Sequence, residues 1–515
     1  MIRLRPSLLT VLAAALLAAV ALPAVTSAAT GPATPTAKAC KQYAADRALP
    51  AITALRPKKG APRAFAMQFK QQARYVRTAA TFRTAIECQI IRYVKPYRAK
   101  DRPNLVVFNE DNGLMTPGIG QRGAAARKLI ETVPPECVGQ DLCAILKTLD
   151  ALRTGYKASV DFYAKKFGEL NPLSSPLLAA TDTQVRDFLG AYSALAKKYG
   201  VYLVASGPLA KFKETTDRKT IDALRDPGLP RPKSVYVATK KDVYNTALVW
   251  GPKDVRKKGP APMRNVVQQN DKVPLTGIEI AQGFTAGPTT GKAAVANLKP
   301  YTLPGTKAKL GIATSLPAFA FGDAGGDPCA DVAKTYMRCL DKLGANVVVQ
   351  DEANPGQWAA SYAGNPNPWQ PLDWMGSGYR NVADPSVRFT YNVTSFMTGS
   401  LADLTFDGQS SITQRGLKAT PPATGCHYVG NATAQPGDAP DAGHPVGPVP
   451  EFLALAPWVA PDGPRADLEA VAKKLAPGSG DRLENDYLET ALVADLPFPA
   501  DPNRPGCATK APPAL

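Results

Sequence analysis

The chain has 515 residues, of which 45% are hydrophobic, and it carries a formal net charge of +18 at pH 7. This apolar content is ample for a packed core and exceeds what one minimal domain needs, while 49 prolines and 41 glycines predict long loops. The basic residues are scattered and are not interleaved with aromatic side chains. This argues against a nucleic-acid-binding groove and fits loose association with an anionic cell envelope.

The first 29 residues have the pattern of a secretory signal peptide. Two arginines precede an apolar run at residues 8–23, and small residues follow around Ala28 and Ala29, where a signal peptidase could cut. A membrane anchor is the alternative interpretation, but the apolar run is short for a bilayer span. We therefore expect cleavage near Ala28–Ala29 and a secreted, extracellular protein.

Helices and strands alternate after a lead-in at residues 30–60. Runs of β-branched and aromatic residues between turn residues predict strands at 105–108, 201–206, 234–239, 244–250, 310–314, 346–350 and 387–393. Amphipathic patterns at 185–200 and 330–345 predict helices. This alternation indicates an α/β architecture with largely buried strands.

A Pro- and Gly-rich stretch at about residues 419–464 breaks the pattern and is expected to be an irregular insertion. A helix at 465–476 and a last strand at 489–498 are expected after it. The chain is therefore expected to form one main domain at residues 61–500, followed by a C-terminal tail at 501–515.

The eight cysteines are even in number, and an exported chain can form disulfide bonds. Short loops close easily, so the simplest pairing joins the local pairs first and leaves two pairs that tie down the ends: Cys137–Cys143, Cys329–Cys339, Cys40–Cys88 and Cys426–Cys507. Eight cysteines allow about 105 pairings, so the sequence does not fix the connectivity. With no CxxC motif and only two histidines, we expect no metal site and no cofactor.

Three polar residues follow predicted strands or turns. Glu110 comes after the strand LVVF, Lys272 lies in NDKVPLTGIE, and Ser315 ends LGIATS. Each residue alone has an ordinary explanation: a helix cap or loop carboxylate, a surface lysine, and a turn serine before a proline.

Taken in this order, the three residues resemble the Glu-Lys-Cys triad of the carbon–nitrogen hydrolase (nitrilase) superfamily. Further segments of the chain also resemble the family: FAMQF, KKYGVYLVASGP, VYNTALVWGP, KVPLTGIE and LGANVVVQDEANPGQW. The resemblance covers roughly residues 61–500 and implies the family's four-layer α-β-β-α sandwich. It implies a small amide or nitrile as substrate, and it leaves homodimer and monomer both open.

The resemblance also implies roles for individual residues. Glu110 would be the general base, Lys272 would stabilise developing negative charge, and the backbone N–H of Leu316 would form part of an oxyanion hole. Glu279 and Trp358 occupy positions that resemble further parts of the family's site, and we expect them to contact the substrate.

The chain departs from the family pattern at the nucleophile, where Ser315 replaces cysteine and Pro317 replaces an acidic residue. A hydroxyl is far less acidic than a thiol, so a carboxylate is a poor base for it. Cys329 at the start of a predicted helix is an alternative nucleophile, although a disulfide bond to Cys339 fits it better. Two hypotheses follow: a hydrolase with a Glu110–Lys272–Ser315 triad, or an inactive relative that binds an amide-like ligand or an envelope component.

Overall fold

The computed structural model describes residues 34–504 and 506, except 46–47, 138–139, 141, 324, 355–369, 407–408, 418–451, 457–488 and 505. The predicted signal peptide, the predicted helix at 465–476 and most of the predicted insertion lie outside the described residues. Within these ranges, no helix combines the length and the hydropathy that crossing a bilayer requires.

The described strands are hydrogen-bonded into one continuous sheet that folds into two layers, called here the first and the second sheet, which join where residues 397–398 pair with residues 69–70. The first sheet has the order β6 (Val266–Asp271), β5 (Val235–Trp250), β4 (Tyr202–Thr215), β3 (Asn104–Val107), β2 (Arg63–Lys70), β14 (Thr490–Asp495) and β1 (Ile52–Ala54). The second has the order β7 (Tyr301–Thr302), β8 (Lys309–Ile312), β9 (Val347–Glu352), β10 (Tyr391–Leu401), β12 (Ser411–Gln414) and β13 (Phe452–Leu455), and β11 (Leu404–Phe406) pairs with β10.

A hydrophobic core lies between the two sheets. Side chains alternate across a strand, so Leu105 and Val107 of β3 face this core together with Val204 of β4. Ile312 of β8 and Val349 of β9 enter the same core from the second sheet. All five side chains are almost fully buried, which makes this layer the centre of the molecule.

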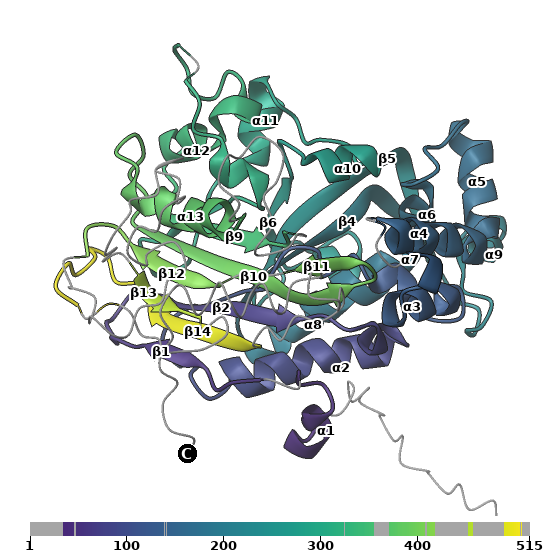
Figure 1. The fold of residues 1–515 in the computed structure, drawn as a ribbon, viewed down its shortest axis with the longest axis horizontal. Helices are drawn as coiled ribbons and strands as arrows, with labels where there is room; N and C mark the ends of the chain where they lie inside the picture. Colours follow the sequence, from purple (N-terminus) through teal and green to yellow (C-terminus); the bar gives the residue numbers. More distant parts are fainter. Residues whose placement is uncertain are drawn as a thin grey trace, which may run out of the picture.

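Helices cover the outer face of each sheet (Figure 1). Val106, on the opposite face of β3, packs in a cluster with residues of α2 (Ala79–Gln89) and α8 (Gly190–Tyr199). Val348 of β9 packs with Tyr336 and Leu340 of α12 (Val332–Lys342), beside α13 (Gln370–Ala383). The order helix, sheet, sheet, helix confirms the predicted α-β-β-α sandwich.

The remaining helices surround these layers. Figure 1 shows one group near the far ends of β4 and β5, and a third core cluster joins these helices to both strands. The group comprises α3 (Ala124–Glu131), α4 (Cys143–Gly155), α5 (Lys157–Phe167), α6 (Ser175–Ala179), α7 (Thr181–Thr183) and α9 (Arg218–Leu224). The short helices α1 (Ala37–Lys41), α10 (Gly277–Ala281) and α11 (Gly291–Asn297) lie in connections between strands or in the lead-in.

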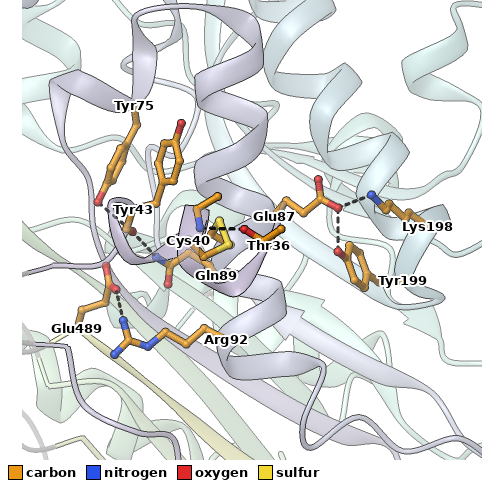
Figure 2. The surroundings of a disulfide bond; sticks show 12 residues. Thr36, Cys40, Tyr43, Tyr75, Glu87, Gln89, Arg92, Lys198, Tyr199 and Glu489 are labelled. Atoms are coloured by element: carbon orange, nitrogen blue, oxygen red, sulfur yellow. Dashed lines mark hydrogen bonds and ion pairs between the residues drawn. A yellow bond between two sulfur atoms is a disulfide. The ribbon is translucent and has the colours of Figure 1, made fainter. Parts of the chain in front are cut away.

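Three disulfide bonds match the predicted pairing: Cys40–Cys88, Cys137–Cys143 and Cys329–Cys339. The first joins α1 to α2 (Figure 2). Next to it, Glu87 of α2 accepts a hydrogen bond from Tyr199 and forms an ion pair with Lys198. Both partners belong to α8, so these contacts link the two helices. The predicted partners Cys426 and Cys507 lie outside the described residues.

The structure differs from the predicted elements at several places, three of which concern strand limits. The strands expected at 234–239 and 244–250 are one strand, β5, because both halves pair with the long β4 across a register irregularity. The strand expected at 387–393 begins only at Tyr391. Strand β13 falls within the stretch expected to be irregular, where its apolar residues pair with β12.

Candidate active site

Four segments at strand ends line one cavity of about 250 Å³. Glu110 follows β3, Lys272 directly follows β6, Ser315 follows β8, and Asn354 follows β9. The lining residues are Glu110, Asp111, Leu114, Asn245, Lys272, Thr276, Gly277, Ile278, Glu279, Gln282, Phe284, Ser315, Ala353, Asn354, Leu404 and Phe406. The three predicted catalytic residues and Glu279 therefore share one cavity.

The loop after β3 is held close to β4 by two glycines. The N–H of Gly113 donates to the Ser206 carbonyl at 3.0 Å. A Cβ at Gly207 would lie 2.6 Å from the Cα of Gly113, so only glycine permits this approach. This contact fixes the segment that carries Glu110.

A buried ammonium lies between two carboxylates. The Nζ atom of Lys272 is 2.7 Å from Oε1 of Glu110 and 3.0 Å from Oε2 of Glu279, and its side chain is 2% exposed. Asn245 donates from Nδ2 to both carboxylates, at 2.7 and 2.9 Å. Glu279 also closes a capping box with Thr276 at the start of α10, which fixes its side chain.

The pKa shifts in this cluster have clear causes. Burial alone would lower the pKa of Lys272, but Glu110 and Glu279 raise it above its usual value, so the amine stays charged. Burial raises the pKa of Glu110 well above its usual value against the opposing effect of Lys272, and neighbouring carboxylates, Asp111 first among them, raise it further. Glu110 is thus a better proton acceptor than an exposed carboxylate.

Ser315 sits on an unfavourable backbone. Its φ is 58° and its ψ is −116°, a left-handed combination that disfavours residues with a Cβ. Its N–H donates to the Asp351 carbonyl at 3.0 Å, and its hydroxyl donates to Oδ1 of Asn354 at 3.2 Å. The hydroxyl therefore lines the cavity but is bonded to a neutral amide rather than to a base.

The remaining residues named in the sequence analysis are Leu316, Trp358 and Cys329. Leu316 begins a 3₁₀ turn, Leu316–Phe319, and is not among the residues that line the cavity. Trp358 lies outside the described residues. Cys329 is joined to Cys339 by a 2.03 Å S–S bond, so its thiol is not available as an alternative nucleophile.

Most residues of the cavity were missed by the sequence analysis, and three of them, Asp111, Asn245 and Asn354, are polar side chains that matter for its chemistry. Each of them stands in a segment that resembles the nitrilase superfamily or directly follows a predicted catalytic residue. Their types, Asp and Asn, are common in loops, so only their position at strand ends carried a signal.

No family model and no curated protein matches the chain. Solved structures of an amidase from Nesterenkonia sp. are similar to it: one at 14% identity, covering 70% of this chain and 84% of that chain with a TM-score of 0.34. A mutant of the amidase from Nesterenkonia sp. AN1 in complex with acrylamide matches at 15% identity, 70% and 85% coverage and a TM-score of 0.36. Sequence identities and TM-scores this low say nothing about the activity of this chain. Its own strand order and helix layers give the chain a four-layer α-β-β-α architecture.

Proposed function

We propose that the protein is a secreted carbon–nitrogen hydrolase that acts on a small amide or nitrile through Glu110, Lys272 and Ser315. One observation carries the proposal: a buried carboxylate–ammonium pair and a serine hydroxyl on a strained strand end line the same cavity. The cavity volume suits a small substrate. The three disulfide bonds support secretion, since such bonds persist in oxidising compartments.

The reaction on an amide would run in two halves. Ser315 Oγ attacks the carbonyl carbon while Glu110 takes the hydroxyl proton, and the charge that develops on the carbonyl oxygen is stabilised by the Lys272 ammonium. The C–N bond breaks, the amine leaves with the proton from Glu110, and an ester on Ser315 remains. Water, deprotonated by Glu110, then cleaves the ester and returns the proton to Ser315.

The hydrogen bond from the Ser315 hydroxyl to Asn354 favours a second function, which is ligand binding without hydrolysis. The Ser315 hydroxyl donates to Asn354, and Lys272 stays charged between its carboxylates, so neither carboxylate nor amine is bonded to the hydroxyl as a base. A protein of this kind would bind an amide-like ligand in the same cavity without hydrolysing it. The two functions differ only in whether turnover occurs.

Ammonia release from a panel of small amides and nitriles tests the proposal. Wild-type protein should release ammonia, and Ser315→Ala and Glu110→Gln should each reduce the rate by at least about 100-fold. Turnover that survives in Ser315→Ala would refute the assigned nucleophile. No turnover in wild type, together with activity in Ser315→Cys, would establish the binding function instead.

Ser193 offers a matched control for the serine variants. It is also buried, and its hydroxyl donates to the side-chain oxygen of an asparagine, Asn265, at 2.6 Å. It does not line the cavity. Ser193→Ala should therefore reproduce the loss of a buried Ser–Asn hydrogen bond without changing ammonia release.

A further inference from the structure

Two hydrogen-bond acceptors in the cavity have no partner among the described residues. The Asp111 carboxylate lines the cavity and makes no hydrogen bond or ion pair there, although its backbone N–H donates to Ser206 Oγ at 3.2 Å. The Asn245 side chain is 2% exposed, and its Oδ1 is also unpartnered, because its Nδ2 is held by Glu110 and Glu279. A buried acceptor without a donor is costly, so Asn245 Oδ1 calls for a donor, and the half-buried Asp111 carboxylate is free to accept N–H groups from the same ligand.

Several donors around the cavity are already engaged. Two of the three N–H groups of the Lys272 ammonium have carboxylate partners, and the Ser315 hydroxyl donates to Asn354. The Nδ2 of Asn354 donates to Glu352 at 2.9 Å. The free hydrogen-bonding capacity of these polar side chains is therefore mainly that of acceptors, which disfavours an anionic ligand.

The charges of the lining residues also disfavour an anionic ligand. Three carboxylates, Glu110, Asp111 and Glu279, face one ammonium, Lys272, so the ionised cavity has two excess negative charges. The net charge of the whole chain is +18, but charges on the surface are screened over roughly 8 Å at physiological salt. The field inside the cavity is therefore dominated by the nearer carboxylates.

We propose that Asp111 and Asn245 form a subsite for a positively charged amino group, and that the preferred ligands are small amides with a cationic end. This inference rests on the proposed amide site and names its substrate class. The ammonium of the ligand would donate to the Asp111 carboxylate and to Asn245 Oδ1, while its amide end would reach Lys272 and Ser315. The apolar lining residues Leu404 and Phe406 would contact the linking carbons.

The backbone at Asp111 makes a clean charge-removing variant available. Its φ is 61°, in the left-handed region that asparagine tolerates as well as aspartate does. Asp111→Asn therefore keeps the side-chain shape and the backbone while removing the charge. Asp187→Asn is the matched control: burial raises the pKa of Asp187 to about 7, as it does for Asp111, but Asp187 lines a separate cavity of about 130 Å³.

Calorimetric titration with three probes tests the subsite: β-alaninamide, its neutral isostere butanamide, and n-butylamine. Wild type and Asp187→Asn should bind β-alaninamide at least about tenfold more tightly than butanamide, and Asp111→Asn should bind the two equally. The preference should increase between pH 6 and pH 8, because Asp111 loses its proton in this range. This pH dependence tests the inference in wild type even where the variant does not fold.

The outcomes separate the subsite from the proposed function. Equal binding of the two amides to wild type, or a preference that survives in Asp111→Asn, overturns the cationic subsite and leaves the amide site standing. Binding of n-butylamine that depends on Asp111, with neither amide bound, supports the subsite and overturns the proposed amide function.

Discussion

The buried ammonium of Lys272 gives the sharpest prediction of stability. Lys272→Met preserves most of the apolar length of the side chain and removes the charge. It leaves Glu110 and Glu279 without the cation that lies 2.7 and 3.0 Å from them, while the neutral Asn245 remains their shared donor. Because both carboxylates line a small cavity, the few water molecules that it holds solvate them less well than bulk water would.

The size of the effect follows from the burial of the pair. Removing one partner of a buried ion pair costs about 3–5 kcal/mol of unfolding free energy, so we expect a loss of this size at pH 7.5. Without Lys272, the folded-state pKa values of both carboxylates lie well above their unfolded values. Protonation then relieves the repulsion at lower pH, by up to about 1.4 kcal/mol per pH unit and proton, so the loss should be smaller by about 1–3 kcal/mol at pH 5.

Urea unfolding of wild type and variant at pH 5 and pH 7.5 measures both effects. Lys198→Met is the control, because Lys198 also pairs with a buried carboxylate, Glu87, but its own side chain is 27% exposed. The control should cost less and should depend less on pH. A loss below about 1 kcal/mol for Lys272→Met, or one that is the same at both pH values, would refute the charge arrangement proposed for the cavity.

Three further predictions concern the backbone and a second buried carboxylate. Gly207→Ala should destabilise the fold by about 3 kcal/mol in urea unfolding, because its Cβ would meet the Gly113 backbone; wild-type stability would contradict this contact. Ser315→Gly should be about 1 kcal/mol more stable than Ser315→Ala by the same measurement, since glycine accepts a φ of 58°, and equal stability would remove the argument for strain. Burial raises the pKa of Glu489 (Figure 2) to about 7, so wild type should lose about 3 kcal/mol relative to Glu489→Gln as the pH rises from 4 to 7. Parallel pH profiles would show that Glu489 is not buried as described.

The strand pattern was predictable because the core strands consist of local runs of β-branched residues. The run that ends in Val349 is bounded by turn residues and became β9 within a few residues of its predicted limits. The polar residues 240–242 read as a turn, yet β5 continues through them because the long partner β4 supplies hydrogen bonds on both sides. Pairing between strands overrides such local signals, and a single sequence does not display it.

The candidate site was predictable to the extent that its residues differ chemically from ordinary loop residues. A carboxylate and a lysine at strand ends stand out, and the structure places Glu110 and Lys272 in contact. Asn354 does not stand out, because asparagine is frequent in turns. Its importance comes from the hydrogen bond that it accepts from the Ser315 hydroxyl. The positive φ of Ser315 has no local signature either, because it is set by the strand on one side and the 3₁₀ turn on the other.

The choice between hydrolysis and binding comes down to the free capacity of Glu110. Its Oε1 accepts from Lys272 and Asn245, and its Oε2 accepts the Ala353 N–H at 3.1 Å. A carboxylate oxygen has two lone pairs, so one acceptor position on Oε2 is free for a proton. A substrate N–H that donates to Asn354 Oδ1 would compete with Ser315 for that oxygen and release the hydroxyl. Turnover therefore requires Ser315 to exchange its bond to Asn354 for one to Glu110, and a ligand that leaves Asn354 untouched should bind without reacting.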